Sequence, residues 1–94
     1  MCVGKRVLVV DDDASIRDVV MQAMVDAGYE CLAVADGFEA LRTTHEFGPD
    51  LIILDVLMPG QSGDEVHAAL RRDPVTRYVP VMRRLVGALG SAGW

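Results

Sequence analysis

The sequence predicts an α/β fold built on a doubly wound parallel sheet. Short, continuous apolar runs rich in β-branched residues are typical of strands that are buried on both faces. The stretches between them place apolar residues three and four positions apart, as amphipathic helices do. The two patterns alternate as β-α-β-α-β-α-β, and right-handed crossovers turn that order into a parallel sheet with helices on both faces.

The first unit comprises a strand over residues 6–10, "RVLVV", and a helix over residues 14–27. The helix carries one apolar stripe, formed by Ile16, Val19, Val20, Ala23, Met24 and Ala27. Gly28 follows the stripe and is well suited to end the helix in the left-handed conformation.

The second unit begins with a strand over residues 31–35, "CLAVA". Asp36 and Glu39 then form a variant of the capping box, which predicts that a helix begins here. The dipeptide Gly48-Pro49 ends this helix.

The third strand, "LIIL" at residues 51–54, is the most strand-like run in the chain and leads into Asp55. After a turn at residues 60–63, Val66, Ala69 and Leu70 mark a third helix, which Asp73-Pro74 closes. A fourth strand is expected over residues 79–82, "VPVM".

The remaining residues, 83–94, follow no clear pattern. Arg83 and Arg84 interrupt what should be a buried strand, and Gly87, Gly90 and Gly93 loosen what comes after them. We therefore treat residues 1–94 as one domain, with a well-patterned part over 5–82 and an unassigned tail over 83–94.

Composition excludes several classes of protein. Of the 94 residues, 51% are hydrophobic, so the chain is not disordered. Its formal net charge of −5 argues against a nucleic-acid-binding surface. No apolar run is long enough to span a bilayer, and the N-terminus lacks the apolar stretch of a secretory signal. Cys2 and Cys31 show no metal-ligand spacing with a histidine, and Cys31 fits a small buried residue better than a reactive thiol. We expect a cytoplasmic protein.

Acidic residues follow two of the predicted strands. Asp11, Asp12 and Asp13 come directly after the first strand, and Asp55 comes after the third. If these strands are neighbours, the carboxylates converge at the switch point of the sheet, where open α/β folds bind ligands. Such carboxylates cannot all stay ionised without a cation, and oxygen ligands partly open to water suit Mg²⁺ or Mn²⁺.

Helix capping is the alternative explanation for the first three acids. Capping is favoured for Asp13, whereas for Asp11 and Asp12 alone both explanations remain open. Asp55 has no capping role to play, and the two strand ends taken together favour a site. Beside a divalent cation a carboxylate can also attack phosphorus, and Asp55, which precedes the constrained turn at residues 57–60, is the best candidate for that nucleophile.

Four segments resemble the receiver domain of two-component response regulators: "RVLVVDDD", "DGFEAL", "PDLIILDVLMPGQSG" and "RYVPVM". The resemblance implies a flavodoxin-like fold with strand order 2-1-3-4-5, which becomes 2-1-3-4 in this chain because we expect the fifth strand to be missing. It also implies that Asp55 accepts a phosphoryl group from a histidine kinase or phosphotransfer protein. Asp12, Asp55 and the backbone carbonyl of Leu57 would bind Mg²⁺ directly, and Asp11 would bind it through water.

The sequence departs from the family pattern after the fourth strand. The family hydroxyl residue aligns with Leu85 or Gly87, and no lysine follows because Lys5 is the only lysine in the chain. We expect the fifth strand, helices four and five and an output domain to be missing, and therefore slower phosphorylation and little conformational response.

Three functions therefore compete. The first is a stand-alone phosphorylatable receiver, which is not an enzyme apart from its own phosphorylation and dephosphorylation. The second is a non-switching or truncated receiver that serves as a phosphate sink or an interaction module. It would dimerise through the exposed edge of the fourth strand or by C-terminal exchange, with Leu85, Val86, Leu89 and Trp94 as candidate contacts. The third, less favoured, is a small phosphohydrolase of the haloacid-dehalogenase type, which the short motif Asp11-x-Asp13-x-Ser15 resembles.

Overall fold

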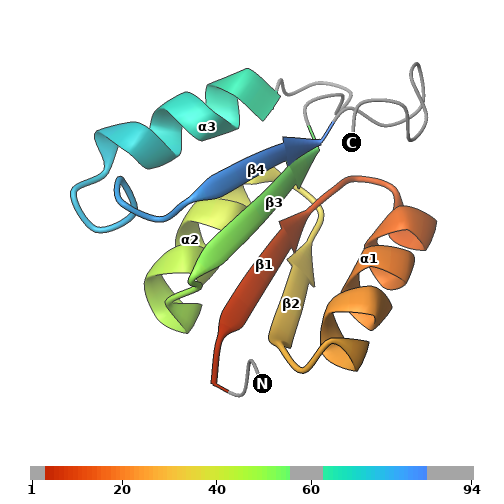
Figure 1. Ribbon diagram of the computed structural model, residues 1–94. Coiled ribbons are helices and arrows are strands. Elements are labelled where there is room, and N and C mark those ends of the chain that lie inside the picture. Colours follow the sequence, from red (N-terminus) through yellow and green to blue (C-terminus); the bar gives the residue numbers. More distant parts are fainter. Residues whose placement is uncertain (1–3, 56–62, 85–94) are drawn as a thin grey trace.

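Strands and helices alternate along the whole described chain (Figure 1). The computed structural model describes residues 4–55 and 63–84. In chain order the elements are β1 (Arg6–Val10), α1 (Ala14–Asp26), β2 (Glu30–Val34), α2 (Gly37–Phe47), β3 (Leu51–Asp55), α3 (Gly63–Arg72) and β4 (Val81–Arg84).

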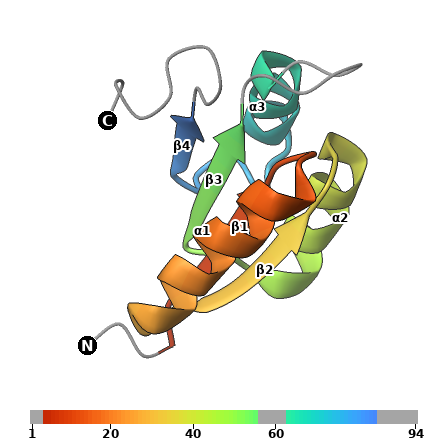
Figure 2. The same ribbon diagram turned by 90° about the vertical axis from the view of Figure 1, so that its right-hand side faces the viewer.

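The four strands form one parallel sheet in the order β2-β1-β3-β4. α1 lies on one face of the sheet, and α2 and α3 lie on the other (Figures 1 and 2). This confirms the predicted fold class and strand order. The fifth strand that we expected to be missing would follow Arg84, and those residues lie outside the described part of the chain. None of the described helices is long and apolar enough to cross a membrane.

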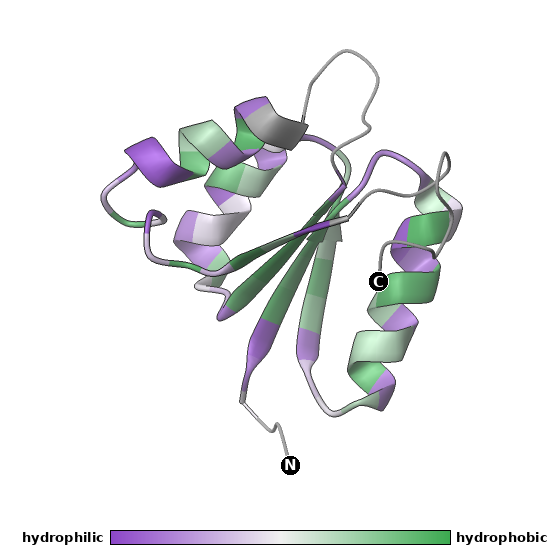
Figure 3. Cartoon of the chain, turned by 45° about the horizontal axis from the view of Figure 1, so that its top comes forward, coloured by the Kyte–Doolittle hydropathy of each residue, from purple (hydrophilic) through white to green (hydrophobic). Residues whose placement is uncertain are grey.

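The central strands are apolar because both of their faces are buried (Figure 3). One core cluster lies under α2 and α3 and contains Leu8, Val10, Ala40, Ile52, Leu54, Val66 and Leu70. The alternate positions of the same strands, Val7, Val9 and Ile53, face α1 and pack against Val20 and Met24. Because both faces of these strands are buried, their sequences do not alternate between apolar and polar residues as those of half-exposed strands do.

The caps of α1 follow the sequence prediction. The Asp13 carboxylate accepts hydrogen bonds from the backbone amides of Ser15, at 2.9 Å, and Ile16, at 3.2 Å. At the other end, Gly28 has a φ of 98°, a conformation that favours glycine. Asp13 therefore caps α1, and Gly28 ends the helix as expected.

The caps of α2 also agree with the prediction. The Asp36 carboxylate accepts a hydrogen bond of 2.9 Å from the Glu39 amide. Gly48 ends the helix in the left-handed conformation, with φ 63° and ψ 56°, and its amide donates to the Thr44 carbonyl. Local cap chemistry sets both ends of this helix.

The fourth strand differs from the prediction, because it covers Val81–Arg84 and not residues 79–82. The Val79 amide donates to the Thr76 carbonyl at 3.1 Å, so Val79 still belongs to the preceding turn. Pro80 has no amide proton, and it contributes only its carbonyl, which accepts from the Ile52 amide at 2.9 Å. The strand continues through both arginines, since β4 is an edge strand of the described sheet and leaves Arg83 exposed. At the other edge, β2 begins one residue earlier than expected, at Glu30.

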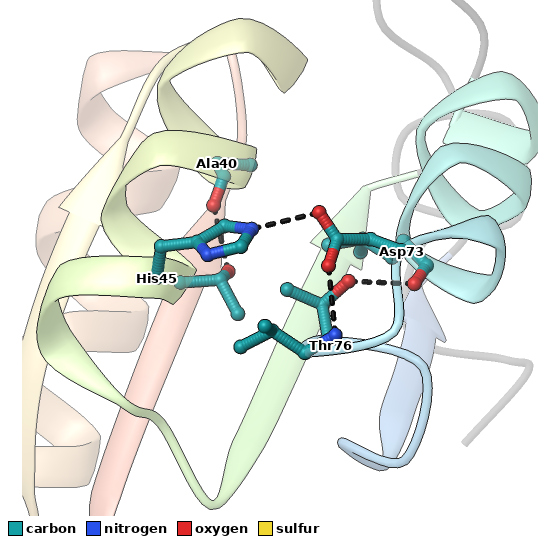
Figure 4. A network of polar contacts seen from close by, with 7 residues as sticks. Ala40, His45, Asp73 and Thr76 are labelled. Atoms are coloured by element: carbon teal, nitrogen blue, oxygen red, sulfur yellow. Dashed lines mark hydrogen bonds and ion pairs between the residues drawn. The ribbon is translucent and has the colours of Figure 1, made fainter.

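A polar contact links α2 to the turn that follows α3 (Figure 4). His45 Nε2 lies 2.7 Å from Asp73 Oδ2, and the other Asp73 oxygen accepts a hydrogen bond of 2.8 Å from the Val75 amide. The hydrogen bond from His45 is the main reason why the pKa of Asp73 lies below its ordinary value. The contact therefore favours the ionised form of Asp73.

We expect Asp73 to make the stability of the domain depend on pH in the acid range. Because its pKa is lower in the folded chain, the carboxylate contributes stability above its unfolded pKa of about 4 and loses that contribution as the pH falls through the folded pKa. The stability difference between wild type and Asp73→Asn should shrink on acidification, as measured by urea unfolding at a series of pH values. Asp26→Asn, which removes an exposed carboxylate bonded to Gln22 and not to a histidine, is the control. A difference independent of pH would contradict the assignment.

Burial predicts unequal effects for two leucines on the same face of the sheet. Leu54 is 0% exposed on the central strand β3, whereas Leu32 is 43% exposed on the edge strand β2. Leu54→Ala should lower the free energy of unfolding by about 2–5 kcal/mol, because it removes buried methyl groups and leaves a cavity. Leu32→Ala should cost less than about 1 kcal/mol in the same urea titration. Equal losses would contradict the described core.

Candidate metal centre

Three carboxylates meet at the carboxyl ends of β1 and β3. Asp11 and Asp12 follow β1, Asp55 is the last residue of β3, and one oxygen from each lies within 4.8 Å of the others. The two strands are hydrogen-bonded neighbours, since β2 pairs with the opposite side of β1. The sheet order therefore brings together acids that are far apart in the sequence, as predicted.

Asp11 is held by hydrogen bonds from three directions. Its amide donates to the Val34 carbonyl at 3.1 Å, and its carboxylate accepts from the Asp13 amide at 2.9 Å. Its carbonyl accepts a hydrogen bond of 2.9 Å from the guanidinium of Arg17, in the second turn of α1. These bonds hold the loop that carries Asp11 and Asp12. The loop therefore needs little rearrangement for both carboxylates to bind one ligand.

The structure divides the three consecutive aspartates between two tasks. Asp11 and Asp12 belong to the carboxylate cluster, and Asp13 does not. Asp13 instead caps α1 through the amides of Ser15 and Ile16. Sequence reasoning missed Arg17, whose charge and position within two turns of the acids were the available signals.

The donor set of this cluster fits a hard divalent cation. Asp11 and Asp55 are only 2% and 6% exposed, while Asp12 is open to solvent. Buried like charges repel one another strongly, and a cation removes that cost. Mg²⁺ takes oxygen ligands at about 2.0–2.1 Å and usually keeps several waters, which an exposed Asp12 allows. Asp11, Asp12 and Asp55 would hold such an ion.

Several residues named in the sequence analysis lie away from the cluster or outside the described chain. Leu57, Leu85 and Gly87 are outside it, so the predicted carbonyl ligand and the expected lack of a hydroxyl stay predictions. Lys5 lies at the amino ends of the strands, where its carbonyl accepts from the Glu30 amide at 2.9 Å. Arg84 occupies the register position beside Asp55 on β4.

The remaining candidate ligands, Cys31 and the histidines, do not join the cluster. Cys31 lies half-buried on β2, and burial raises the pKa of its thiol, which fits the small packing residue that we expected. His45 contacts Asp73, and His67 accepts a hydrogen bond of 3.2 Å from Arg71. In the described part of the chain, the only metal-type cluster is therefore made of carboxylates alone.

The amino-acid sequence is similar to those of known proteins. Residues 7–84 match the family model of the response regulator receiver domain. The phosphate regulon transcriptional regulatory protein PhoB of Pseudomonas aeruginosa is 42% identical over 80 residues, which cover 85% of this chain and 35% of that protein. The DNA-binding response regulator MtrA of Mycobacterium tuberculosis is 39% identical and covers 73% of this chain and 30% of its own. The chain thus spans about a third of the length of these relatives.

Solved structures agree with that match. The chemotaxis protein CheY4 of Vibrio cholerae superposes with a TM-score of 0.80 at 40% identity, over 84% of this chain and 66% of its own. The response regulator TrrA of Thermotoga maritima, solved in complex with Mg²⁺-BeF, gives a TM-score of 0.68 at 43% identity, over 72% of this chain and 59% of its own. With its sheet order, its carboxylate cluster and its sequence all in agreement, the chain belongs to the response regulator receiver domain family of two-component systems.

Proposed function

We propose that this receiver domain accepts a phosphoryl group on Asp55 in a two-component phosphorelay. The observation that carries the proposal is the convergence of Asp11, Asp12 and Asp55, two of them buried, at the switch point of the sheet. The donor is a histidine kinase or a phosphotransfer protein. The domain acts as a phosphoacceptor and not as an enzyme that turns over a substrate, although its own acids take part in its phosphorylation and dephosphorylation.

In this mechanism each acid has a separate role. An oxygen of Asp55 attacks phosphorus in line with the bond to the donor nitrogen, and the imidazole leaves with the electron pair of the broken P–N bond. Asp12, Asp55 and the Leu57 carbonyl would hold Mg²⁺, or Mn²⁺ in its place, and Asp11 would help to hold it through a water molecule. When bound, the metal neutralises charge on the carboxylates and the phosphoryl oxygens. The bonds from Asp13 and Arg17 keep Asp11 in place during the transfer.

Two further observations support this role. TrrA, a relative at 43% identity, was solved with Mg²⁺-BeF, which contains the metal that suits three carboxylates. The hydrolase alternative needs Asp13 beside Asp11, whereas the Asp13 carboxylate caps α1 and lies outside the cluster. The geometry therefore favours a phosphoacceptor over a phosphohydrolase.

A second role, as an interaction module or phosphate sink, is favoured by the edge strand β4. Among the described residues, α1 covers β1 and β2, and Met82 on β4 remains 47% exposed. Unpaired strand edges with apolar surface tend to associate. We propose that the chain forms a homodimer through this edge or by exchange of its C-terminal segment.

Phosphorylation can be tested by incubating the protein with Mg²⁺ and acetyl phosphate and then measuring its intact mass. Wild type should gain the mass of one phosphoryl group, and Asp55→Asn should gain none, since the amide is a poor nucleophile. EDTA should abolish labelling, and Asp12→Asn should slow it. Asp18→Asn, which removes an exposed acid on α1, serves as the control and should label like wild type. An unlabelled wild type, or equal labelling of Asp55→Asn, would overturn the proposal.

Dimerisation can be tested by light scattering at increasing protein concentration. Wild type should approach twice the mass of one chain, and Met82→Lys should shift the equilibrium to monomer, because a charge on an edge strand opposes pairing. Leu32→Lys, at a similarly exposed position on the opposite edge strand, is the matched control. A clean monomer at high concentration for wild type refutes the dimer.

A further inference from the structure

Positive charge is concentrated in one short segment of this acidic protein. Residues 71–84 contain five of the nine basic residues and a single acid, Asp73. That segment has a formal charge of +4, which leaves −9 for the rest because the whole chain carries −5. Arg83 and Arg84 lie at the far end of β4, so the local positive surface before that strand comes from the other three arginines of the segment.

Three of these arginines gather at the end of α3 and in the turn that precedes β4. We call the surface formed by Arg71, Arg72, Val75, Arg77 and Tyr78 the arginine patch; all five are exposed. The guanidinium of Arg71 donates to the Arg77 carbonyl, and the guanidinium of Arg77 lies over the Tyr78 ring, 5.3 Å from its centroid. These contacts join Arg71, Arg77 and Tyr78 into one surface, and Arg72 and Val75 are their near neighbours along the chain.

Tyr78 and Val75 add apolar area to the charged patch. Tyr78 is 81% exposed and Val75 is 62% exposed, so the core gains little from either side chain. Exposed aromatic residues next to arginines are the composition enriched at protein interfaces. The patch thus combines the two residue types that most often carry binding energy.

The turn under the patch is firmly held. The Arg77 amide donates to the Asp73 carbonyl at 2.9 Å, and the buried Thr76 hydroxyl donates to the Leu70 carbonyl at 2.6 Å. The contact between His45 and Asp73 fastens the same turn to α2 (Figure 4). Since the backbone of this turn is already ordered, it would lose little conformational entropy when a partner binds.

The patch lies far from the carboxylate cluster in the fold. The turn of residues 73–80 enters β4 at its amino end, whereas Asp11 and Asp55 lie at the carboxyl ends of their strands (Figure 1). The last turn of α3 stands out as strongly hydrophilic (Figure 3). Binding at the patch would therefore leave the proposed phosphoacceptor site open.

We propose that the arginine patch binds a short acidic segment of a protein partner, one that also carries an apolar or aromatic side chain. Guanidinium groups bind carboxylates through paired hydrogen bonds, and Tyr78 and Val75 offer contact area for the apolar residue. Nucleic acids and anionic membranes fit less well. They extend beyond the patch and meet the negative remainder of the chain within a Debye length of about 8 Å.

The test uses a labelled synthetic peptide that combines glutamates with leucine and tryptophan. Fluorescence anisotropy of the peptide should report binding to the full, unphosphorylated chain, and the affinity should fall as salt is added. Amide chemical-shift changes in the ¹⁵N-labelled protein should be confined to residues 71–79. Arg77→Glu should weaken binding about tenfold, because it replaces an attraction by a repulsion. Tyr78→Ala should weaken it about fivefold.

Two matched controls separate the patch from general effects of charge and exposure. Arg42→Glu makes the same charge reversal on the exposed surface of α2, and Phe38→Ala removes an aromatic side chain that is also 81% exposed. Both should bind the peptide like wild type. Arg77→Glu retains the Arg71 contact, which uses the backbone carbonyl of residue 77.

Several results would overturn the proposal. They are equal binding by Arg77→Glu and Arg42→Glu, shift changes mainly outside residues 71–79, and no binding by wild type at low salt. Tighter binding of single-stranded DNA or of phosphatidylglycerol vesicles than of the peptide would assign the patch to another class of partner. Because no arm involves Asp55 or Mg²⁺, failure here is distinct from failure of the proposed phosphoacceptor function.

Discussion

The pairing of β1 with β3 determines both the core and the position of the carboxylates. β2 lies on the far side of β1, so the chain order reverses between β1 and β3, and the loops beyond their carboxyl ends diverge. This pairing places Asp55 beside Asp11 and Asp12. It also requires both faces of the central strands to be buried, under α1 on one side and under α2 and α3 on the other. The same contacts that stabilise the core therefore position the carboxylates.

Two groups of charged residues lie at opposite ends of the sheet: carboxylates follow β1 and β3, and arginines precede β4. At the carboxyl ends of β1 and β3, buried Asp11 and Asp55 lie close to Asp12, and like charges so close together repel one another. At the amino end of β4, Arg71 and Arg77 line an ordered turn. A domain of this size has only a small net free energy of folding, so repulsion between close like charges is a significant fraction of it.

Local chemistry explains which parts of the structure could be predicted. Asp13, Asp36, Gly28 and Gly48 set helix ends through hydrogen bonds and dihedral angles that involve only nearby residues, and all four predictions were confirmed. The prediction for the fourth strand was wrong by two residues, because Pro80 and the turn before it compete with the apolar pattern at Val79. Arg83 was read as a break in a buried strand, whereas an edge strand tolerates an exposed charge. Burial depends on neighbours that a linear pattern does not reveal.

Sequence patterns alone were enough to predict the element order, the helix caps, the family resemblance and the acids that could form a site. Periodicity, turn residues and short motifs contain that information because they act over a few positions along the chain. Tertiary packing was needed to show which acids meet, how deeply Asp11 and Asp55 are buried, and that Arg17 bonds to the Asp11 carbonyl. It also decided that His45 meets Asp73 and that Arg71 meets Arg77. These outcomes depend on how helices pack on a sheet, and the distances between side chains arise only when the whole chain is folded.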